Sequence, residues 1–442
     1  MFTIESFCPR QSRLLLMVAL VITMKWLAVP TIAAEKTMTI NDVVVTGKHN
    51  PALSSFDELM TTFVKTHQVP GASLAVTRAG QLVYARGFGY ADLAKKQPVQ
   101  PDSQFRVASL SKPITAVAIL QLVDQGKLKL TDRVFTILKP KPFFEDPTDK
   151  IDPRLQQVTI LHCLQHSGGW DRNASFDPMF QPVRIARSLG FDPPARAEHV
   201  IRFMMGKPLD FDPGTRYAYS NYGYCLLGRV IEARSGLKYD QYVKQQVLAP
   251  VGVRQMRIGR TMLEDRAPRE VRYYDELQRT GRSVFAKNLG KKVPAPYGAW
   301  YLEAMDSHGA WIASARDLVR FAAALDQPAK SPLLKEASIR RMFARPAGVL
   351  GHDDQQQPKV VYYGCGWSVR TLPGKPTVNT WHTGSLDGTS TILVRRHDGL
   401  NWAVLFNTRN GTNNHRLSTM IDGRVHQAAD AVQQWPDRDL QR

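Results

Sequence analysis

The chain lacks an apolar run long enough to cross a membrane, which needs about 20 residues. The longest run near its start, 14–24, holds eleven residues, with Arg10 and Arg13 before it and small residues after it. A basic start, a short apolar stretch and a small-residue exit predict a secretory signal peptide over residues 1–34. We therefore expect a secreted or periplasmic protein of residues 35–442, with membrane contact only through the N-terminal segment if that segment is not cleaved.

Cysteine is also scarce, with four residues in 442. Cys8 falls in the predicted signal peptide, which leaves an odd number, Cys163, Cys225 and Cys365, and so excludes a complete disulfide framework. Buried thiols, or one disulfide beside one free thiol, both agree with this count. The chain has neither the Gly-x-Ser-x-Gly elbow of α/β-hydrolases nor the Gly-x4-Gly-Lys-[Ser/Thr] phosphate loop of nucleotide hydrolases.

Positive charge dominates, since 58 Lys and Arg face 39 Asp and Glu and give a formal net charge of +19. The basic residues are dispersed, and no zinc-finger spacing or basic-region helix accompanies them, so we expect no nucleic-acid partner. His162 and His166 have the spacing of a zinc site, but Cys163 stands where the zinc-protease motif has Glu. The sequence therefore indicates neither a metal nor an organic cofactor.

Hydrophobic patterns indicate strands at both ends of the chain. Apolar runs at 72–78 and 81–89 flank Ala79-Gly80 and predict a hairpin, and further strands are expected at 360–369, 378–384, 389–396 and 402–407. Helical spacing occurs at 56–67, 109–125, 159–165, 221–235, 313–325 and 415–434. We expect an α/β (α+β) fold: an antiparallel sheet flanked by helices, built from about 35–130 and 305–442, with an all-helical insertion at about 131–304. The active site would lie at the seam between these parts.

The first chemical signal is Ser109-Leu110-Ser111-Lys112 at the start of a predicted helix. A Ser and a Lys three residues apart share one helix face, so the amine can reach the hydroxyl. A buried Lys with a lowered pKa can take the hydroxyl proton and so activate a nucleophile. The alternative is a helix cap, in which Ser109 or Ser111 accepts from free backbone N–H groups.

The second signal is Tyr219-Ser220-Asn221, which follows Pro213-Gly214. A Tyr beside a nucleophile can shuttle a proton to the leaving group, and an Asn amide can position both a Lys and a substrate. A turn in which Asn221 caps the next helix explains the same residues.

The third signal is His382-Thr383-Gly384, which ends a predicted strand ahead of Ser385. The glycine would let a substrate backbone approach the strand closely. The backbone N–H groups of Ser385 and Ser109 would form an oxyanion hole. Taken alone, His382 is more typical of a partly buried, hydrogen-bonded histidine.

Together and in this order, the three motifs resemble those of the serine β-lactamases and penicillin-binding proteins, in the branch of class C β-lactamase-like proteins, DD-carboxypeptidases, D-aminopeptidases and esterases. The similarity extends over about 55–410 and includes segments such as 87–92, 161–170 and 213–228. It implies the β-lactamase/transpeptidase-like fold, with Ser109 as the acylated nucleophile, Lys112 as its activating partner and Tyr219 as general base and acid. Substrate would be bound by Asn221, His382, Thr383, Gly384 and Ser385.

The resemblance implies a serine hydrolase that forms an acyl-serine with an amide or ester: a D-amino-acid or peptidoglycan-derived peptide, a simple ester or a β-lactam. His382 stands where the family has Lys, which weakens the positive charge facing a substrate carboxylate at pH 7. We therefore expect DD-peptidase, D-aminopeptidase-like or esterase activity rather than a true β-lactamase. Arg370 is a candidate for the missing charge, with a plain surface Arg as the alternative, and the polar segment 256–296 would reshape the cleft.

A different class of function also agrees with these residues. The chain would then be a catalytically inactive, penicillin-binding-like protein of the cell envelope that binds or senses a ligand. Retention of Ser109, Lys112, Tyr219 and Asn221 favours the enzyme.

Overall fold

The computed structural model describes residues 38–40, 42–275, 277–412, 414–437 and 439–440, so the predicted signal peptide lies outside the described residues. Residues 36–442 form one compact unit. None of the helices described in that unit is long and apolar enough to cross a membrane.

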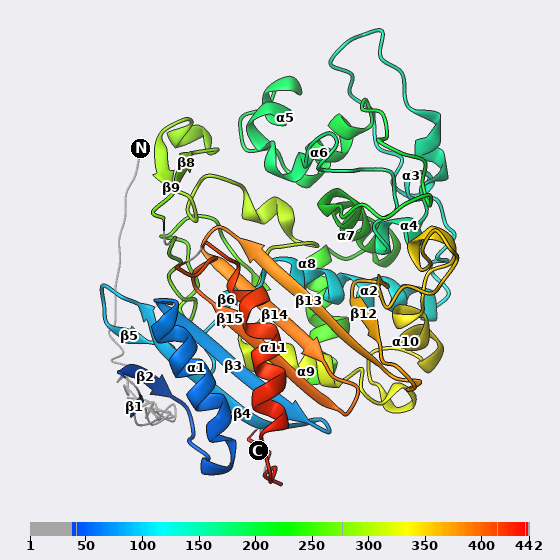
Figure 1. The fold of residues 1–442 in the computed structure, drawn as a ribbon. Helices are drawn as coiled ribbons and strands as arrows, with labels where there is room; N and C mark the ends of the chain where they lie inside the picture. Colours follow the sequence, from blue (N-terminus) through cyan, green and yellow to red (C-terminus); the bar gives the residue numbers. More distant parts are fainter. Residues whose placement is uncertain (1–37, 41, 276, 413, 438, 441–442) are drawn as a thin grey trace, which may run out of the picture. The chain divides into compact units, whose positions relative to one another are not determined.

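A ten-stranded sheet runs through this unit, and its strands come from both ends of the chain (Figure 1). The order is β1-β2-β4-β3-β15-β14-β13-β12-β11, with β5 paired to β4, and all pairings are antiparallel. The junction of the two ends is the pair β3–β15, where Ala75 lies opposite Ala403. The predicted sheet is thus confirmed. Its strands are β1 Met38–Ile40, β2 Val43–Thr46, β3 Gly71–Arg78, β4 Gln81–Asp92, β5 Gln97–Pro98, β11 Val361–Tyr363, β12 Ser368–Thr371, β13 Val378–Leu386, β14 Thr389–Arg395 and β15 Leu400–Phe406.

The hairpin β3–β4 forms where the sequence predicts it. Ala79 and Gly80 join its strands with φ of 48° and 82°, the left-handed conformation that a two-residue hairpin turn requires. Side chains of β15 alternate between two apolar cores, since Trp402 belongs to one and Ala403 to the other. Strands covered on both faces appear in a sequence as continuous apolar runs.

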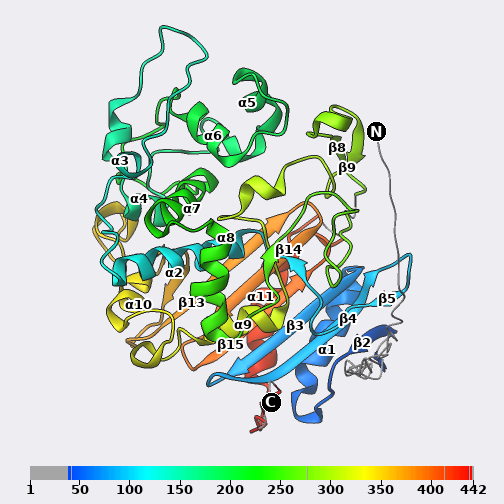
Figure 2. The ribbon, with the colours of Figure 1, turned by 180° about the vertical axis from the view of Figure 1, so that it is seen from behind.

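Helices cover the two faces of the sheet. Helix α1 (Ser54–Thr66) and helix α11 (Leu417–Asp430) contact each other and lie over the face turned to the viewer in Figure 1. Helix α9 (Ala315–Ala323) packs on β3 and β15 from the other side, which Figure 2 shows. Helix α10 (Glu336–Phe343) lies near the β11–β12 edge.

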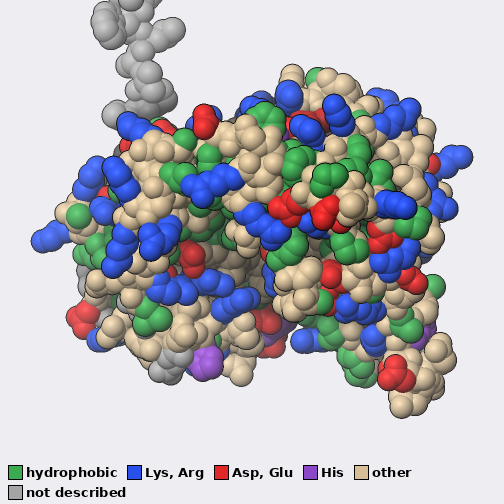
Figure 3. Space-filling model, turned by 90° about the horizontal axis from the view of Figure 1, so that it is seen from above, with side chains coloured by type: hydrophobic (Ala, Val, Ile, Leu, Met, Phe, Trp, Pro, Cys, Tyr) green, Lys and Arg blue, Asp and Glu red, His purple; other side chains and the backbone are tan. Residues whose placement is uncertain are grey.

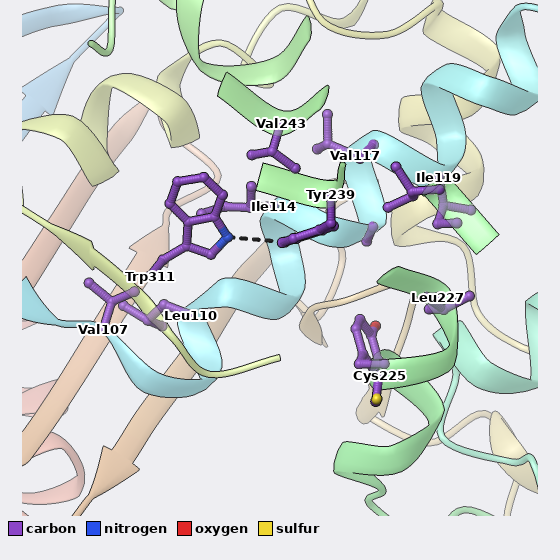
Figure 4. Close-up of a cluster of buried hydrophobic side chains, with 14 of the residues drawn as sticks. Val107, Leu110, Ile114, Val117, Ile119, Cys225, Leu227, Tyr239, Val243 and Trp311 are labelled. Atoms are coloured by element: carbon purple, nitrogen blue, oxygen red, sulfur yellow. Dashed lines mark hydrogen bonds between the residues drawn. The ribbon is translucent and has the colours of Figure 1, made fainter. Parts of the chain in front are cut away.

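Helix α2 (Ser111–Asp124) is buried on all sides and joins the sheet to the helical part of the molecule. Its Ile114, Val117 and Ile119 lie among side chains of helix α7 (Asn221–Ser235) and of helix α8 (Tyr239–Tyr242) (Figure 4). In the same cluster, Trp311 Nε1 donates to the Tyr239 hydroxyl at 3.0 Å. Because close packing resists displacement, the start of α2, which carries Lys112, is held in one position.

The segment 131–304 contains helices α3 to α8 but is not entirely helical. Besides α7 and α8, its helices are α3 Val134–Leu138, α4 Ile160–Leu164, α5 Pro182–Ser188 and α6 Ala197–Met204. It departs from the all-helical expectation in three strands of two or three residues, β7 Arg257–Ile258, β8 Thr280–Arg282 and β9 Lys292–Pro294. Strand β7 completes a small sheet with β10 (Trp311–Ala313) and β6 (Phe105–Arg106), next to Ser109. These strands form because the fold brings a pairing partner beside each of them, although their own short sequences show little strand pattern.

Two smaller expectations are resolved by the structure. The strand expected at 360–369 is two strands, β11 and β12, because the chain turns at Gly366, where φ is 83°. Cys163, Cys225 and Cys365 are all buried and unpaired, so the alternative with one disulfide is wrong.

Candidate active site

Ser109 lies in a tight turn that precedes α2. The turn, Ala108–Leu110, is a 3-10 helix, and Ala108 has φ of +49°, a conformation that costs energy for a residue with a side chain. Neither this turn nor α2 has a side-chain cap, and the Ser111 hydroxyl donates to the carbonyl of Ala108 at 2.7 Å. The helix-cap interpretation of Ser109 is therefore wrong, and its hydroxyl is available for chemistry.

Lys112 is fully buried beneath Ser109 and has three oxygen atoms around its amine. Its Nζ lies 3.2 Å from Ser109 Oγ, 2.8 Å from Asn221 Oδ1 and 3.1 Å from the carbonyl oxygen of His308. A neutral amine has two N–H bonds and one lone pair, and an amide or carbonyl oxygen can only accept. Both N–H bonds are thus used by Asn221 and His308, and the lone pair is left to Ser109.

The direction in which the pKa of Lys112 is shifted favours the neutral amine that this arrangement needs. Burial lowers its pKa well below the ordinary lysine value; Asp177 opposes this effect and Arg172 adds to it. An unprotonated amine with its lone pair at a hydroxyl can act as a general base. The geometry therefore makes Lys112 able to take the proton of Ser109.

Tyr219 lies against both members of this pair. Its hydroxyl is hydrogen-bonded to the Ser109 side chain, and Lys112 Nζ lies 4.7 Å from the centre of its ring. Burial raises the pKa of Tyr219 above its usual value. The group is therefore a phenol at neutral pH, which is the form that donates a proton, so the acid half of its predicted role is the one the environment favours.

Asn221 is oriented by its neighbours rather than acting as a helix cap. Ser220 caps α7, since its hydroxyl accepts from the N–H of Gly223 at 3.2 Å. The Asn221 side chain instead lies between Lys112, which donates to Oδ1, and Asp177, whose Oδ2 accepts from Nδ2 at 2.7 Å. The amide thereby connects a buried carboxylate to the candidate base.

His382, on β13, has both ring nitrogens engaged by the protein. Nδ1 lies 2.7 Å from the carbonyl oxygen of Thr383 and Nε2 lies 2.9 Å from the Tyr363 hydroxyl. Because a carbonyl can only accept, Nδ1 carries the proton and Tyr363 donates to Nε2. Burial lowers the pKa of His382 to about 3, with a smaller contribution from Lys112 when its amine is protonated. His382 therefore carries no charge at neutral pH.

The segment that leads into Ser109 leaves no room for a side chain at Gly384. A Cβ at this position would lie 2.2 Å from the carbonyl oxygen of Val107 and 2.3 Å from Thr391 Oγ1. The absent side chain therefore lets β13 lie against the segment that leads into Ser109. That a substrate backbone also approaches this glycine stays a prediction.

The predicted residues meet at a cavity of about 700 Å³. Six of the eight line it, namely Ser109, Tyr219, Asn221, His382, Thr383 and Ser385, whereas Lys112 lies beneath it and Gly384 lies behind it. Sequence patterns did not identify most of the other lining residues, among them Arg172, Asp177, Phe180, Tyr217, Trp300, His308, Asp387, Arg409 and Arg416. These residues belong to loops and element ends, where no sequence period marks them.

Three of these lining residues are arginines. Arg409 donates to Ser385 Oγ and to Asp387 Oδ1, both at 3.0 Å. Arg172 lies 4.9 Å from the centre of the Tyr219 ring. Burial lowers the pKa of Arg416, and the positive charges of Arg409 and Arg172 lower it further. Among the described residues, neither Arg172 nor Arg416 pairs with a carboxylate. Figure 3 shows Lys and Arg side chains around a hollow in the surface.

Arg370, our candidate for the missing positive charge, lies elsewhere. It is exposed on β12, with its guanidinium 5.1 Å from the Trp381 ring centre, and it does not line the cavity. The surface interpretation of Arg370 is the one that agrees with the structure.

The polar segment 256–296 is anchored at the active site by Arg106. This arginine is buried, lies 4.3 Å from the ring centre of Tyr273, and donates to the carbonyl oxygens of Pro296 and Arg260 at 2.7 and 2.8 Å. Its backbone N–H also donates to the Tyr273 hydroxyl at 2.7 Å. The Arg106 guanidinium also lies 5.3 Å from the ring centre of Trp300, which lines the cavity.

Comparison with known proteins agrees with this geometry. A profile of the Beta-lactamase family matches residues 56–424. The chain belongs to the Beta-lactamase family, whose members are serine hydrolases. It is 28% identical over 359 residues to Penicillin-binding protein 4* of Bacillus subtilis (strain 168), which covers 77% of this chain and 68% of that protein. This chain covers at most 62% of the length of the next curated relatives that it matches.

Solved structures show the same fold. The octameric penicillin-binding protein homologue from Pyrococcus abyssi has a TM-score of 0.62 and 23% identity, over 88% of this chain and 79% of that one. The D-amino acid amidase from Ochrobactrum anthropi SV3, complexed with L-phenylalanine amide, has a TM-score of 0.62 and 20% identity, over 87% and 99%. At these identities the likeness establishes the fold alone. The family match over residues 56–424, together with the similarity to Penicillin-binding protein 4*, confirms the predicted resemblance to the serine β-lactamase and penicillin-binding-protein superfamily.

Proposed function

We propose that this chain is an exported serine hydrolase that cleaves amide or ester bonds through an acyl-enzyme on Ser109. The observation that carries the proposal is the placement of Lys112, whose Nζ lies 3.2 Å from Ser109 Oγ. The other two oxygen atoms near Nζ, from the Asn221 amide and the His308 carbonyl, can only accept hydrogen bonds. Export is supported by the basic start and short apolar run of residues 1–34.

In the first step, Ser109 Oγ attacks the substrate carbonyl while its proton passes to Lys112 Nζ. The oxyanion would be held by the backbone N–H groups of Ser109 and Ser385. Tyr219 then gives its hydroxyl proton to the leaving amine or alcohol, and the Lys112 ammonium returns a proton to the phenolate. Water hydrolyses the acyl-serine by the same transfers in reverse.

The lining of the cavity favours a substrate with an apolar part and a carboxylate. Phe180 and Tyr217 supply exposed aromatic surface, and Arg172 and Arg416 supply positive charges that pair with no carboxylate among the described residues. A short peptide with D-amino acids and a free C-terminal carboxylate meets both conditions. D-Amino acid amidase and penicillin-binding proteins are among the proteins of the same fold, so we place DD-peptidase, D-aminopeptidase-like and esterase activity ahead of β-lactam hydrolysis.

The test is the intact mass of the protein after incubation with a penicillin, beside a Ser109→Ala variant. We expect a stable adduct of the antibiotic's mass on the wild type and none on the variant. Turnover of a nitrophenyl ester by the wild type alone would support the esterase form of the same mechanism. An adduct that persists in Ser109→Ala contradicts the assignment of the nucleophile, and neither adduct nor turnover leaves the inactive binding protein.

A further inference from the structure

Asp177 is a carboxylate of the cavity that none of the three motifs contains. Its Oδ2 accepts from Nδ2 of Asn221 at 2.7 Å, and its Oδ1 accepts from the backbone N–H of Met179 at 3.1 Å. Asn221 is the first residue of α7, whereas Asp177 lies 44 residues earlier on a loop. The contact is therefore made by the tertiary fold, and both oxygens of the carboxylate are used.

The orientation of the Asn221 amide depends on this contact. Only one orientation sets Oδ1 toward Lys112, where it accepts at 2.8 Å. In that orientation the amine end faces Asp177, and a carboxylate accepts hydrogen bonds without donating them. The flipped amide would set N–H groups against the Lys112 amine and oxygen against oxygen at Asp177. Asp177 therefore permits one orientation of Asn221.

We propose that Asp177 is a positioning residue of the hydrolase: it fixes the amide of Asn221, and through that amide it holds the Lys112 amine at Ser109. The inference rests on the proposed function, because it assigns Asp177 a part in the same reaction. If Asn221 flips, Nζ loses an acceptor and its lone pair is no longer directed at Ser109. Small displacements of a base from its proton donor lower rates by about 10²-fold.

Asp177 also acts on Lys112 through its charge. The groups that interact with the amine are Arg172 and Asp177, the rings of Tyr219 and Tyr224, and His166, His308 and His382. Burial raises the pKa values of both tyrosines and lowers those of the three histidines. These five groups are therefore uncharged at neutral pH, which leaves Arg172 and Asp177 as the groups that can carry charge. Burial raises the pKa of Asp177, and the hydrogen bonds from Asn221 and Met179 oppose that rise.

The direction in which the pKa of Lys112 shifts would distinguish loss of the Asp177 charge from a general loss of structure. Burial lowers the pKa of Lys112, and the carboxylate of Asp177 raises it against that trend. Replacing Asp177 by a neutral residue removes the opposition, so the pKa of Lys112 falls further. The amine then remains unprotonated to a lower pH, even while its poorer placement slows the reaction.

The test variant is Asp177→Asn, which keeps an oxygen for the N–H of Met179 but sets an amine against Nδ2 of Asn221. We expect acylation by a nitrophenyl ester to slow by about 10²-fold, with the acid limb of the rate profile moved to lower pH. Asp177→Glu keeps the charge and should keep the acid limb near its wild-type position. Asp171→Asn is the matched control: it removes a carboxylate of the same loop that bonds Arg216, and it should change neither quantity.

Two measurements separate this inference from the proposed function. Titration of Lys112 by ¹³C NMR of lysine-labelled protein needs no turnover, and its pKa should fall in Asp177→Asn and not in Asp171→Asn. If Asp177 acts through Asn221, adding Asp177→Asn to Asn221→Ala lowers the acylation rate no further. An unchanged Lys112 pKa with a wild-type rate, or losses that multiply in the double variant, would overturn the role of Asp177. Absence of acylation in the wild type would overturn the proposed function, while the NMR titration still decides the inference.

Discussion

The buried Arg86 and the arginines of the cavity differ in their surroundings. Arg86, on β4, is 1% exposed; it donates to Asp57 at 2.6 Å and to the carbonyl oxygen of Thr46 at 3.2 Å. The other oxygen of Asp57 accepts from Tyr84 at 2.6 Å. The buried charge of Arg86 is thus compensated by hydrogen bonds to groups of the protein itself.

The arginines of the cavity are arranged in the opposite way. Arg172 and Arg416 are exposed at its wall and have no carboxylate partner in the described part of the chain. Only Arg409 pairs with an acid, Asp387. Like charges gathered without partners disfavour the folded state, so these arginines do not stabilise it, and their presence at the cavity supports the proposed binding of a substrate carboxylate. The two groups therefore predict opposite effects of mutation.

The largest effect is expected at the paired group. Arg86→Met leaves Asp57 buried without its cation, which should cost about 3–5 kcal/mol of unfolding free energy. Urea denaturation followed by circular dichroism measures this loss. The folded fraction should acylate at the wild-type rate, because Arg86 does not line the cavity. A stable variant with impaired acylation would reverse the comparison.

A smaller effect, on substrate and not on stability, is expected at the unpaired group. Arg416→Gln should lower kcat/KM for a peptide with a free C-terminal carboxylate by about 3- to 5-fold, the size of an exposed ion pair. Turnover of a neutral nitrophenyl ester should stay unchanged, and the urea midpoint should not fall, because the charge that is removed is repelled by Arg409 and Arg172. Arg370→Gln is the control, since it removes an exposed arginine outside the cavity. Equal losses for peptide and ester would contradict a charge-based role.

The smallest effect is that of salt. Raising the ionic strength from about 0.05 to 0.5 M shortens the screening distance several-fold, so kcat/KM for the anionic peptide should fall by about 2-fold. The ester should be unaffected in the same range. The fall for the peptide should be smaller in Arg416→Gln, because among the described residues only Arg172 then remains as an unpaired charge of the cavity. Salt dependence that is the same for both substrates would place the interaction outside the cavity.

The sequence predicted the parts of this molecule that repeat a local pattern. The hairpin β3–β4, helix α7 and the strands β13 to β15 lie within a few residues of their expected bounds, because apolar periodicity and turn residues are local signals. Ser109, Lys112 and Tyr219 were identified because their spacing is fixed by a helix or by a short motif. The two-strand division of 360–369 was missed, since one glycine turn decides it.

The rest of the site could not be predicted, for a physical reason. Asp177 is brought to Asn221 across 44 residues of chain, and Arg172 comes from a loop far in sequence from the β15–α11 loop, which carries both Arg409 and Arg416. No period or spacing relates residues that only the tertiary fold brings together. The neutrality of His382 depends on its burial in the folded chain, where Tyr363, 19 residues away on another strand, bonds to its Nε2. A substitution visible in the sequence therefore acquires its meaning only from the structure.

The central claim is that Lys112 is an unprotonated base at neutral pH, and the pH dependence of acylation tests it most directly. The rate of acyl-enzyme formation from a neutral nitrophenyl ester would be measured for the wild type from about pH 5 to 10, with Ser109→Ala as the blank. Because burial lowers the pKa of Lys112 well below 10.5, we expect the rate to be on its plateau at neutral pH and to fall only in acid. A rate that climbs steadily toward the ordinary lysine value of 10.5 would contradict the account.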